Sequence, residues 1–184
     1  LEVAGERITA PRIVIAAGSR CTSPASIEGL DAAWSSGRMH NSDTIMRIDD
    51  VPRRLVIIGG GFIAAEFAHV FSAFGSQVTV VVRGDRMLRH EDEEISRRYT
   101  EAAGRDVNLL LGHATRRVET GEDGVRVHVS DSSGAERVVE ADVLLVATGR
   151  RPNSDRLDVR AGGIALDEAG FVLVDAWQRT SVEG

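Results

Sequence analysis

The sequence contains no lysine: all 22 of its basic residues are arginine. A P-loop needs a lysine on the β- and γ-phosphates of a nucleotide, and both Schiff-base chemistry and a Tyr/Lys proton relay need an amine. The composition therefore excludes these three kinds of site. The 28 acidic residues leave a formal net charge of −6. We therefore expect no nucleic-acid partner, because general binding to nucleic acid needs a positive field.

Cysteine is nearly absent too, because Cys21 is the only one. A single cysteine cannot form an intrachain disulfide, a redox dithiol or a cysteine-based zinc site. The five histidines lack the HExxH spacing of a helix-borne zinc site. We expect no metal site. The longest apolar run, 55–65, contains three glycines and is far too short to cross a membrane. No signal peptide precedes it, so we expect a cytoplasmic location and no membrane partner.

The clearest pattern that is present is a strand, a turn and a helix over residues 55–75. An apolar strand over 55–58 is followed by three glycines, and Gly75 then ends the helix. A second strand over 78–82 follows. The apolar residues of one helix face are Ile63, Phe67, Val70, Phe71 and Phe74.

Weaker patterns predict the other elements. We expect a hairpin-like N-terminal segment with a buried parallel strand over 12–18, a surface connection over 21–42, and a helix from the acidic run 91–94 to about residue 103. Further strands are expected over 107–111, 143–146 and 171–174, with three antiparallel strands within 114–140. The predicted fold class is α/β: a Rossmann-like three-layer dinucleotide-binding domain with a small antiparallel β-meander.

Residues 8–20 and 139–151 resemble each other without gaps. Both segments contain an apolar strand pattern that ends in Ala-x-Gly, and both have an arginine two residues after the glycine. Repetition of one supersecondary unit predicts two related nucleotide-binding domains in the parent protein. The alternative is chance similarity between two apolar strands.

Residues 59–64 read GGGFIA, which is G-x-G-x-x-A. The motif follows a strand, opens a helix and leads to a second strand, which is the context that a dinucleotide site requires. Gly59 allows the tight turn, and Gly61 lets a pyrophosphate approach the backbone. The N–H groups and dipole at the helix start then favour the anion.

The end of the second strand indicates which nicotinamide nucleotide binds. An NAD site places a carboxylate there for the ribose 2′-hydroxyl, but the strand end here carries Arg83, with Arg86 and Arg89 nearby. Guanidinium groups suit a 2′-phosphate. Two such contacts contribute about 3–6 kcal/mol, or roughly 10²- to 10⁴-fold, with solvent exposure favouring the lower end. We therefore predict NADPH as the cofactor. The alternative is three solvated arginines on a turn.

These segments resemble the flavoprotein disulfide reductases of the glutathione reductase family. GGGFIAAE at 59–66 matches the family pattern G-x-G-[YF]-I-A-x-E, and ATGRRPN at 147–153 matches A-T-G-R-x-P-N. The arginines at 83 and 89 match the NADPH-type pair. Residues 41–47 and 66–73 are most similar to one branch of the family. The resemblance covers nearly the whole chain.

The resemblance implies that Gly59, Gly61, Ile63, Arg83, Arg89 and Gly149 contact NADPH. Phe62 would cover the flavin face, and Arg150 would belong to the FAD side. Glu66 would lie near the nicotinamide and the flavin; the alternative for Glu66 is an ordinary exposed position on the helix. Residues 42–151 would form the NAD(P)H-binding domain, 1–41 a remnant of the FAD-binding domain with its connection, and 152–184 a return segment into it.

In such enzymes NADPH reduces FAD, which reduces an active-site disulfide and then a small-molecule disulfide substrate, and the parent is a homodimer. The FAD fingerprint, its Cys-x4-Cys and the C-terminal His-Glu pair are not among these residues. We therefore expect no catalytic residue here and binding of NADPH without turnover. Relatives acting on glutathione, mercuric ion or dihydrolipoamide remain alternatives, as does a non-catalytic NADP(H)-binding module.

Overall fold

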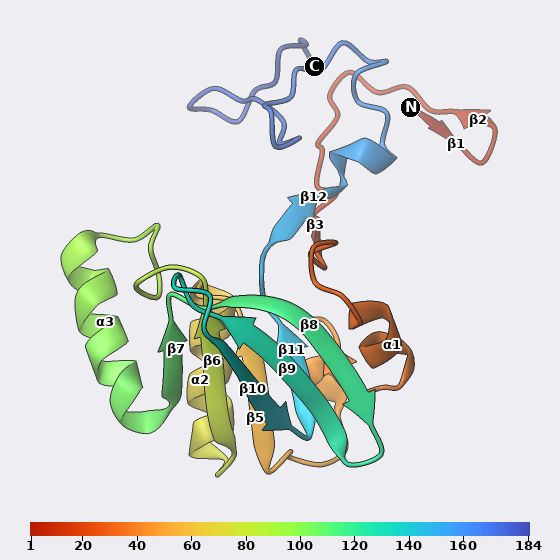
Figure 1. Ribbon diagram of the computed structural model, residues 1–184. Helices are drawn as coiled ribbons and strands as arrows, with labels where there is room; N and C mark the ends of the chain where they lie inside the picture. The colour runs from red at the N-terminus through yellow and green to blue at the C-terminus, as the bar shows by residue number, and fades with distance from the viewer. The chain divides into compact units, whose positions relative to one another are not determined.

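The computed structural model describes residues 1–184, which divide into two compact units (Figure 1). Residues 21–149 form the larger one, here called the large unit. Residues 1–20 and 150–184 form the small unit. The GGG turn and the arginines at 83 and 89 belong to the large unit.

A five-stranded parallel sheet runs through the large unit in the order β4-β11-β5-β6-β7. Its residues are mostly β-branched or leucine, which suits strands buried on both faces. Ile58 lies opposite both Val81 and Val146, so these three strands end at the same edge. The strands are β4 (Met39–His40), β5 (Arg54–Ile58), β6 (Gln77–Val82), β7 (Asn108–Leu111) and β11 (Val143–Val146).

Two helices pack on one face of this sheet. α2 (Phe62–Ala73) contacts β5 and β6, and α3 (Glu93–Asp106) contacts β7. Ala64 and Ala68 of α2 are buried against the sheet, where a small side chain lets the helix approach closely. No helix in the described chain is both long and apolar enough to traverse a lipid bilayer.

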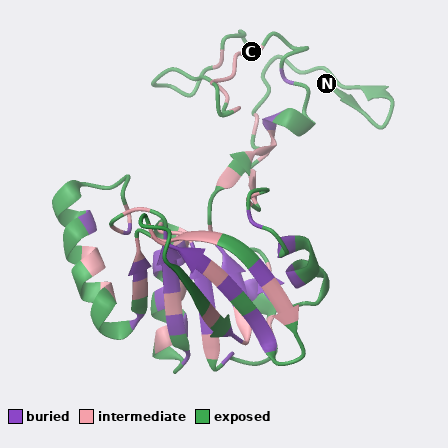
Figure 2. Cartoon of the chain, in the orientation of Figure 1, coloured by how far each residue is buried: buried purple, intermediate pink, exposed green.

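The other face of the sheet is covered by an antiparallel meander. Its strands β8 (Ala114–Gly121), β9 (Gly124–Ser130) and β10 (Glu136–Ala141) pair in the order β10-β9-β8. The short helix α1 (Leu30–Ser35) packs beside β8, and a 3-10 turn, η1, spans Ile45–Arg47. Figure 1 shows the meander across the sheet, and Figure 2 shows the buried residues concentrated in these strands. The predicted α/β fold with three layers and a meander is confirmed.

The small unit has little regular structure and few buried residues (Figure 2). The hairpin expected at the N-terminus is present, but its strands have only two residues each. The elements are β1 (Glu2–Val3), β2 (Glu6–Arg7), β12 (Arg150–Pro152), the 3-10 turn η2 (Asn153–Arg156) and the first two residues of β3 (Ser19–Cys21), which pairs with β12.

Three predictions about the flanking segments are wrong. Residues 12–18 form no strand, and Val14 is 88% exposed, because no neighbouring strand pairs with this apolar run. Residues 171–174 contain only an isolated bridge between Val172 and Leu166. The segment 21–42 is more than a surface connection, because it supplies α1 and the edge strand β4. Its buried residues are Ile27, Leu30, Ala33 and Met39.

Candidate functional site

The turn between β5 and α2 requires glycine at its first two positions. Gly59 has a φ of +138°, and a Cβ there would lie 2.3 Å from the carbonyl oxygen of Ala147. A Cβ on Gly60 would lie 2.7 Å from Cγ1 of Val82. The Gly59 N–H also donates to the carbonyl of Val81 at 3.0 Å. The turn is therefore pressed against the ends of β6 and β11.

Gly61 differs from these two because it faces open space. It is the N-cap of α2 in an extended conformation, and a Cβ placed on it would meet no atom within 4 Å. No side chain caps the helix, and its first turn contains no acidic residue. The backbone donors and the positive end of the helix dipole are thus left available to an external anion.

The first turns of α2 present the other predicted residues of this helix. Phe62 is 62% exposed, Ile63 is half-buried and Glu66 is exposed. Tyr99 of α3 fixes the helix from its inner side. The phenol of Tyr99 donates to the carbonyl of Ala65 at 3.1 Å, and burial raises the pKa of this phenol.

Residues 83–89, here called the arginine loop, follow the end of β6. Arg83 is exposed and makes no ion pair in the described chain, and Arg89 is exposed and donates from Nε to Nε2 of His90 at 3.3 Å. Arg86 instead has its Nη1 3.6 Å from a Glu93 carboxylate oxygen. Of the three arginines that the sequence offers, 83 and 89 are therefore the two without a carboxylate partner.

The arginine loop is tied directly to the glycine turn. The N–H of Leu88 donates to the carbonyl of Gly60 at 2.6 Å. This bond brings the predicted pyrophosphate and 2′-phosphate positions together in one region. Sequence reasoning missed Leu88, because a backbone hydrogen bond across 28 residues leaves no local pattern.

Gly149 lies just after the end of β11, the third strand that ends at the candidate site. Its φ is +144°, and its carbonyl accepts from both the N–H and the Oγ1 of Thr22, each at 3.0 Å. Thr148 donates back to the Thr22 carbonyl at 3.3 Å. The sequence analysis did not predict Thr22, because its hydrogen-bond partner Gly149 lies 127 residues away in the chain.

Arg150 is the one predicted site residue outside the large unit. It belongs to the small unit, where its guanidinium donates to the hydroxyl of Ser19 at 2.9 Å and to the Ser19 carbonyl at 2.7 Å. The other eight residues lie within the large unit. They are Gly59, Gly61, Phe62, Ile63, Glu66, Arg83, Arg89 and Gly149.

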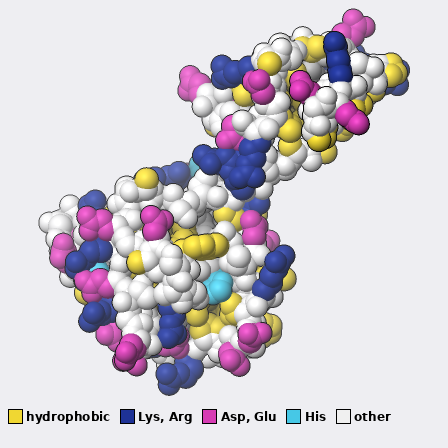
Figure 3. Space-filling model, turned by 90° about the vertical axis from the view of Figure 1, so that its right-hand side faces the viewer, with side chains coloured by type: hydrophobic (Ala, Val, Ile, Leu, Met, Phe, Trp, Pro, Cys, Tyr) yellow, Lys and Arg dark blue, Asp and Glu magenta, His cyan; other side chains and the backbone are white.

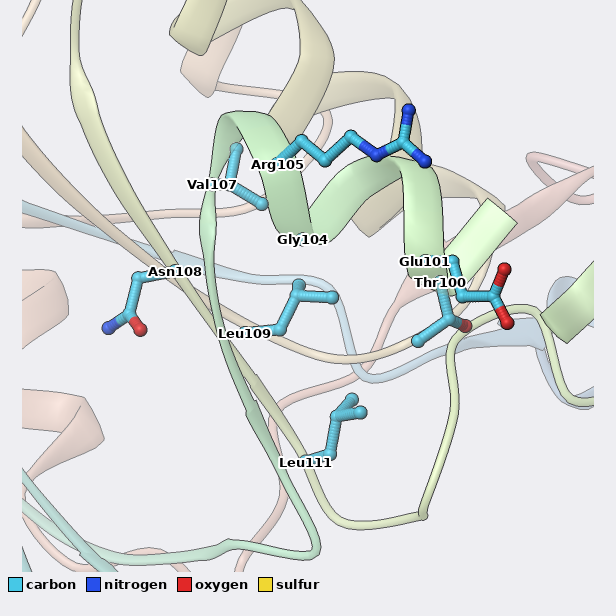
Figure 4. Close-up of a pocket in the computed structure, with 8 residues that line it drawn as sticks. All are labelled: Thr100, Glu101, Gly104, Arg105, Val107, Asn108, Leu109 and Leu111. Atoms are coloured by element: carbon cyan, nitrogen blue, oxygen red, sulfur yellow. The ribbon is translucent and has the colours of Figure 1, made fainter. Parts of the chain in front are cut away.

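A separate surface hollow of about 550 Å³ lies between α3 and β7 (Figure 4). It shares no residue with the predicted site. Its lining residues are Thr100, Glu101, Gly104, Arg105, Val107, Asn108, Leu109 and Leu111. Acidic and basic side chains are interspersed on the face of the large unit seen in Figure 3. In the described chain, His, Cys, Asp and Glu form no group of three placed to hold a metal ion.

The family model described as pyridine nucleotide-disulphide oxidoreductase matches residues 1–184. The chain is 45% identical over 186 residues to mycothione reductase of Mycobacterium tuberculosis, with 98% of this chain covered. It is 37% identical to mercuric reductase of Bacillus cereus, also over 98% of this chain. With dihydrolipoyl dehydrogenase of Vibrio cholerae the identity is 34% over 99% of this chain.

The branch of the family that segments 41–47 and 66–73 resemble is that of the mycothione reductases, and the 45% identity over 98% of the chain confirms the similarity to this branch. Among solved structures, the HOCl-induced flavoprotein disulfide reductase RclA from Escherichia coli superposes with a TM-score of 0.76 at 30% identity, over 91% of this chain and 37% of that one. The chain spans 37%, 28% and 38% of the length of the mycothione reductase, the mercuric reductase and the dihydrolipoyl dehydrogenase.

Proposed function

The chain belongs to the pyridine nucleotide-disulphide oxidoreductase family, and from this premise we propose that its large unit binds NADPH within an FAD-dependent disulfide reductase. One observation carries the proposal. The N-terminus of α2 has no cap from a side chain, no acid in its first turn and free space above Gly61. A pyrophosphate fits this arrangement, because it needs backbone donors, a favourable dipole and close approach.

The arginine loop supports NADPH over NADH. Arg83 and Arg89 are exposed beside the glycine turn, and the loop offers no carboxylate partner to either. Since both guanidinium groups are solvated, we expect the lower end of the range for two charge-assisted contacts, about 3 kcal/mol. That free energy corresponds to roughly a 100-fold preference for NADPH.

The remaining residues would orient the cofactor. In this proposal the backbone at Ile63 and Gly149 borders the nucleotide, while Phe62 and Glu66 lie on the exposed side of α2 that faces the nicotinamide and the flavin. Arg150 would belong to the FAD side, residues 152–184 would return into the FAD-binding domain, and residues 1–41 would be a remnant of that domain with its connection. Bound NADPH supplies a hydride, which the family's chemistry passes through FAD to a disulfide.

We infer that the substrate of the complete enzyme is mycothione, and that the enzyme is a cytoplasmic homodimer. The mycothione reductase relative supports this choice, because its identity of 45% exceeds the 37% of the mercuric reductase and the 34% of the dihydrolipoyl dehydrogenase. NADPH-dependent assays of the complete enzyme with mycothione, glutathione disulfide, mercuric ion and lipoamide as electron acceptors should show turnover with mycothione above the others. A higher kcat/KM with any of the other three would contradict the substrate assignment.

Titration calorimetry of the 184-residue chain tests the cofactor assignment directly. We expect Kd for NADPH to be roughly 100-fold below Kd for NADH. Arg83→Glu should bring NADPH binding to the level of NADH. Arg137→Glu is the control, because it makes the same change of charge at an exposed position of β10. Equal affinities in the unmutated protein would overturn the assignment of NADPH.

A further inference from the structure

The arginine loop has no regular secondary structure, yet its backbone is held at several points. The carbonyl of Gly84 accepts from the N–H of Gly112 at 2.7 Å, and Leu88 donates to Gly60. Leu88 has a φ of +54°, a left-handed conformation that few side-chain-bearing residues adopt. A loop with such a conformation persists only where its surroundings determine it.

Met87 is the central anchor of the loop. Its side chain is fully buried, and both polar groups of its backbone are bonded to side chains of α3. The Met87 N–H donates to Oγ1 of Thr100 at 3.1 Å. The Met87 carbonyl accepts from the hydroxyl of Ser96 at 2.6 Å.

The two side chains are also linked through the Ser96 backbone. Oγ1 of Thr100 donates to the carbonyl of Ser96 at 2.8 Å while it accepts from Met87. The Thr100 hydroxyl is therefore oriented by its bond to the Ser96 carbonyl while it accepts from the loop, and the Ser96 hydroxyl donates its proton to the loop. Ser96 is fully buried, so its hydroxyl has no water with which to exchange.

The position of Met87 bears on recognition because Arg83 and Arg89 flank it in the sequence. Fixing the Met87 backbone between the two arginines limits the positions that their guanidinium groups can occupy around a bound nucleotide. We propose that Ser96 and Thr100 are positioning residues that set the preference for NADPH over NADH by holding the arginine loop through Met87. This inference rests on the proposed function, since it assumes that the loop contacts a 2′-phosphate.

Thr100→Val tests the proposal, because valine has nearly the same shape as threonine and lacks the hydroxyl. We expect the Kd for NADPH to rise about tenfold and the Kd for NADH to stay within twofold. Thr100→Ser restores the hydroxyl and should restore the ratio of the two affinities. Ser96→Ala, which removes the other bond to Met87, should move the ratio in the same direction.

An unchanged ratio in both Thr100→Val and Ser96→Ala would overturn the positioning role, as would an equal loss for both nucleotides. Arg83→Glu separates this failure from failure of the proposed function. If Arg83→Glu removes the preference and Thr100→Val does not, only the positioning role is wrong. If the unmutated chain binds NADPH and NADH equally well, both the positioning role and the assignment of NADPH are wrong.

Hydrogen exchange in the unmutated protein gives a measurement that needs no variant. The Met87 amide should already be protected from exchange without nucleotide, because Thr100 holds it in the free protein. Its protection should change less than twofold when NADPH is added. Protection that develops only with NADPH would show that the nucleotide, and not α3, orders the loop.

Discussion

The two long helices of the large unit begin in opposite ways. At α3, the carboxylate of Asp92 accepts from the N–H groups of Glu94 and Ile95 at 3.0 and 3.3 Å, and two glutamates occupy the first turn. At α2, Gly61 offers no side chain, and the first turn has no acid. The chain caps the N-terminus of α3 with a side chain and leaves the N-terminus of α2 without a side-chain cap.

This difference shows how the function can be inferred from what a helix lacks. An N-cap side chain stabilises a helix by about 0.5–2 kcal/mol, so an open N-terminus gives up stability. At α2 the cap is missing at the one place where free space, a glycine turn and an arginine loop meet. At α3, where no ligand is expected, the Asp92 carboxylate accepts from two backbone N–H groups.

Gly59→Ala should have the largest effect. Its Cβ would lie 2.3 Å from a backbone oxygen at a positive φ, so the turn must move. We expect a loss of roughly 3 kcal/mol in the free energy of unfolding, at the upper end of the range for overpacking, and loss of NADPH binding. Urea denaturation measures the first effect. Gly61→Ala is the control and should change stability by less than about 1 kcal/mol, because its Cβ meets no atom.

Gly61→Asp transfers the cap of α3 to α2. The extended backbone of Gly61 suits an N-cap carboxylate, so the thermal midpoint should hold or rise. The same carboxylate occupies the anion site, and we expect NADPH affinity to fall at least about 100-fold, or 2.7 kcal/mol.

Gly61→Asn is the matched variant, because it caps the helix without the charge. It should retain more NADPH affinity than Gly61→Asp in the same titration. Undiminished binding by Gly61→Asp would contradict the assignment of the pyrophosphate to this helix N-terminus.

Asp92→Ala tests the N-terminus of α3, which the chain caps with its own side chain. Removing the cap of α3 should lower the free energy of unfolding by about 1 kcal/mol, since two backbone N–H groups lose their partner. Asp92→Asn should retain most of the stability. NADPH affinity should stay within about twofold in both variants, and a large loss in Asp92→Asn would show that the two N-termini are not independent.

Acidification should have the smallest effect. Hydrogen bonds from Arg97 and Arg98 hold the pKa of Glu94 below its usual range. A carboxyl group with a lowered pKa in the folded state stabilises the fold above its unfolded pKa, and this contribution is lost as the pH falls through the folded value. The protection factors of the amides in the first turn of α3, taken relative to the intrinsic exchange rate at each pH, should therefore fall on acidification below about pH 4.5. Glu94→Gln should show less of this pH dependence, and an identical pH profile in Glu94→Gln would refute the attribution.

The parts of the fold that the sequence predicts correctly are those with strong local patterns. The change from strand to helix at Gly59–Gly61 and the alternation over residues 114–140 both reflect side chains close to one another along the chain. The wrong predictions depend on distant partners. An apolar run such as 12–18 forms a buried strand only where a sheet receives it, and β4 is defined by its pairing with β11 about a hundred residues later.

The predicted site divides in the same way. Gly59, Gly61 and Arg83 follow from spacing and strand ends, so the sequence is enough to propose them. The hydrogen bonds that hold the site together, from Thr22 to Gly149 and from Ser96 to Met87, join segments with no shared pattern. Only the folded structure reveals such contacts.

A crystal structure of the chain with NADPH tests the central claim most directly. The account predicts the pyrophosphate within hydrogen-bonding distance of the N–H groups at the start of α2, over Gly61, with the 2′-phosphate beside Arg83 and Arg89. A well-ordered NADPH bound elsewhere, with this helix N-terminus empty, would contradict it.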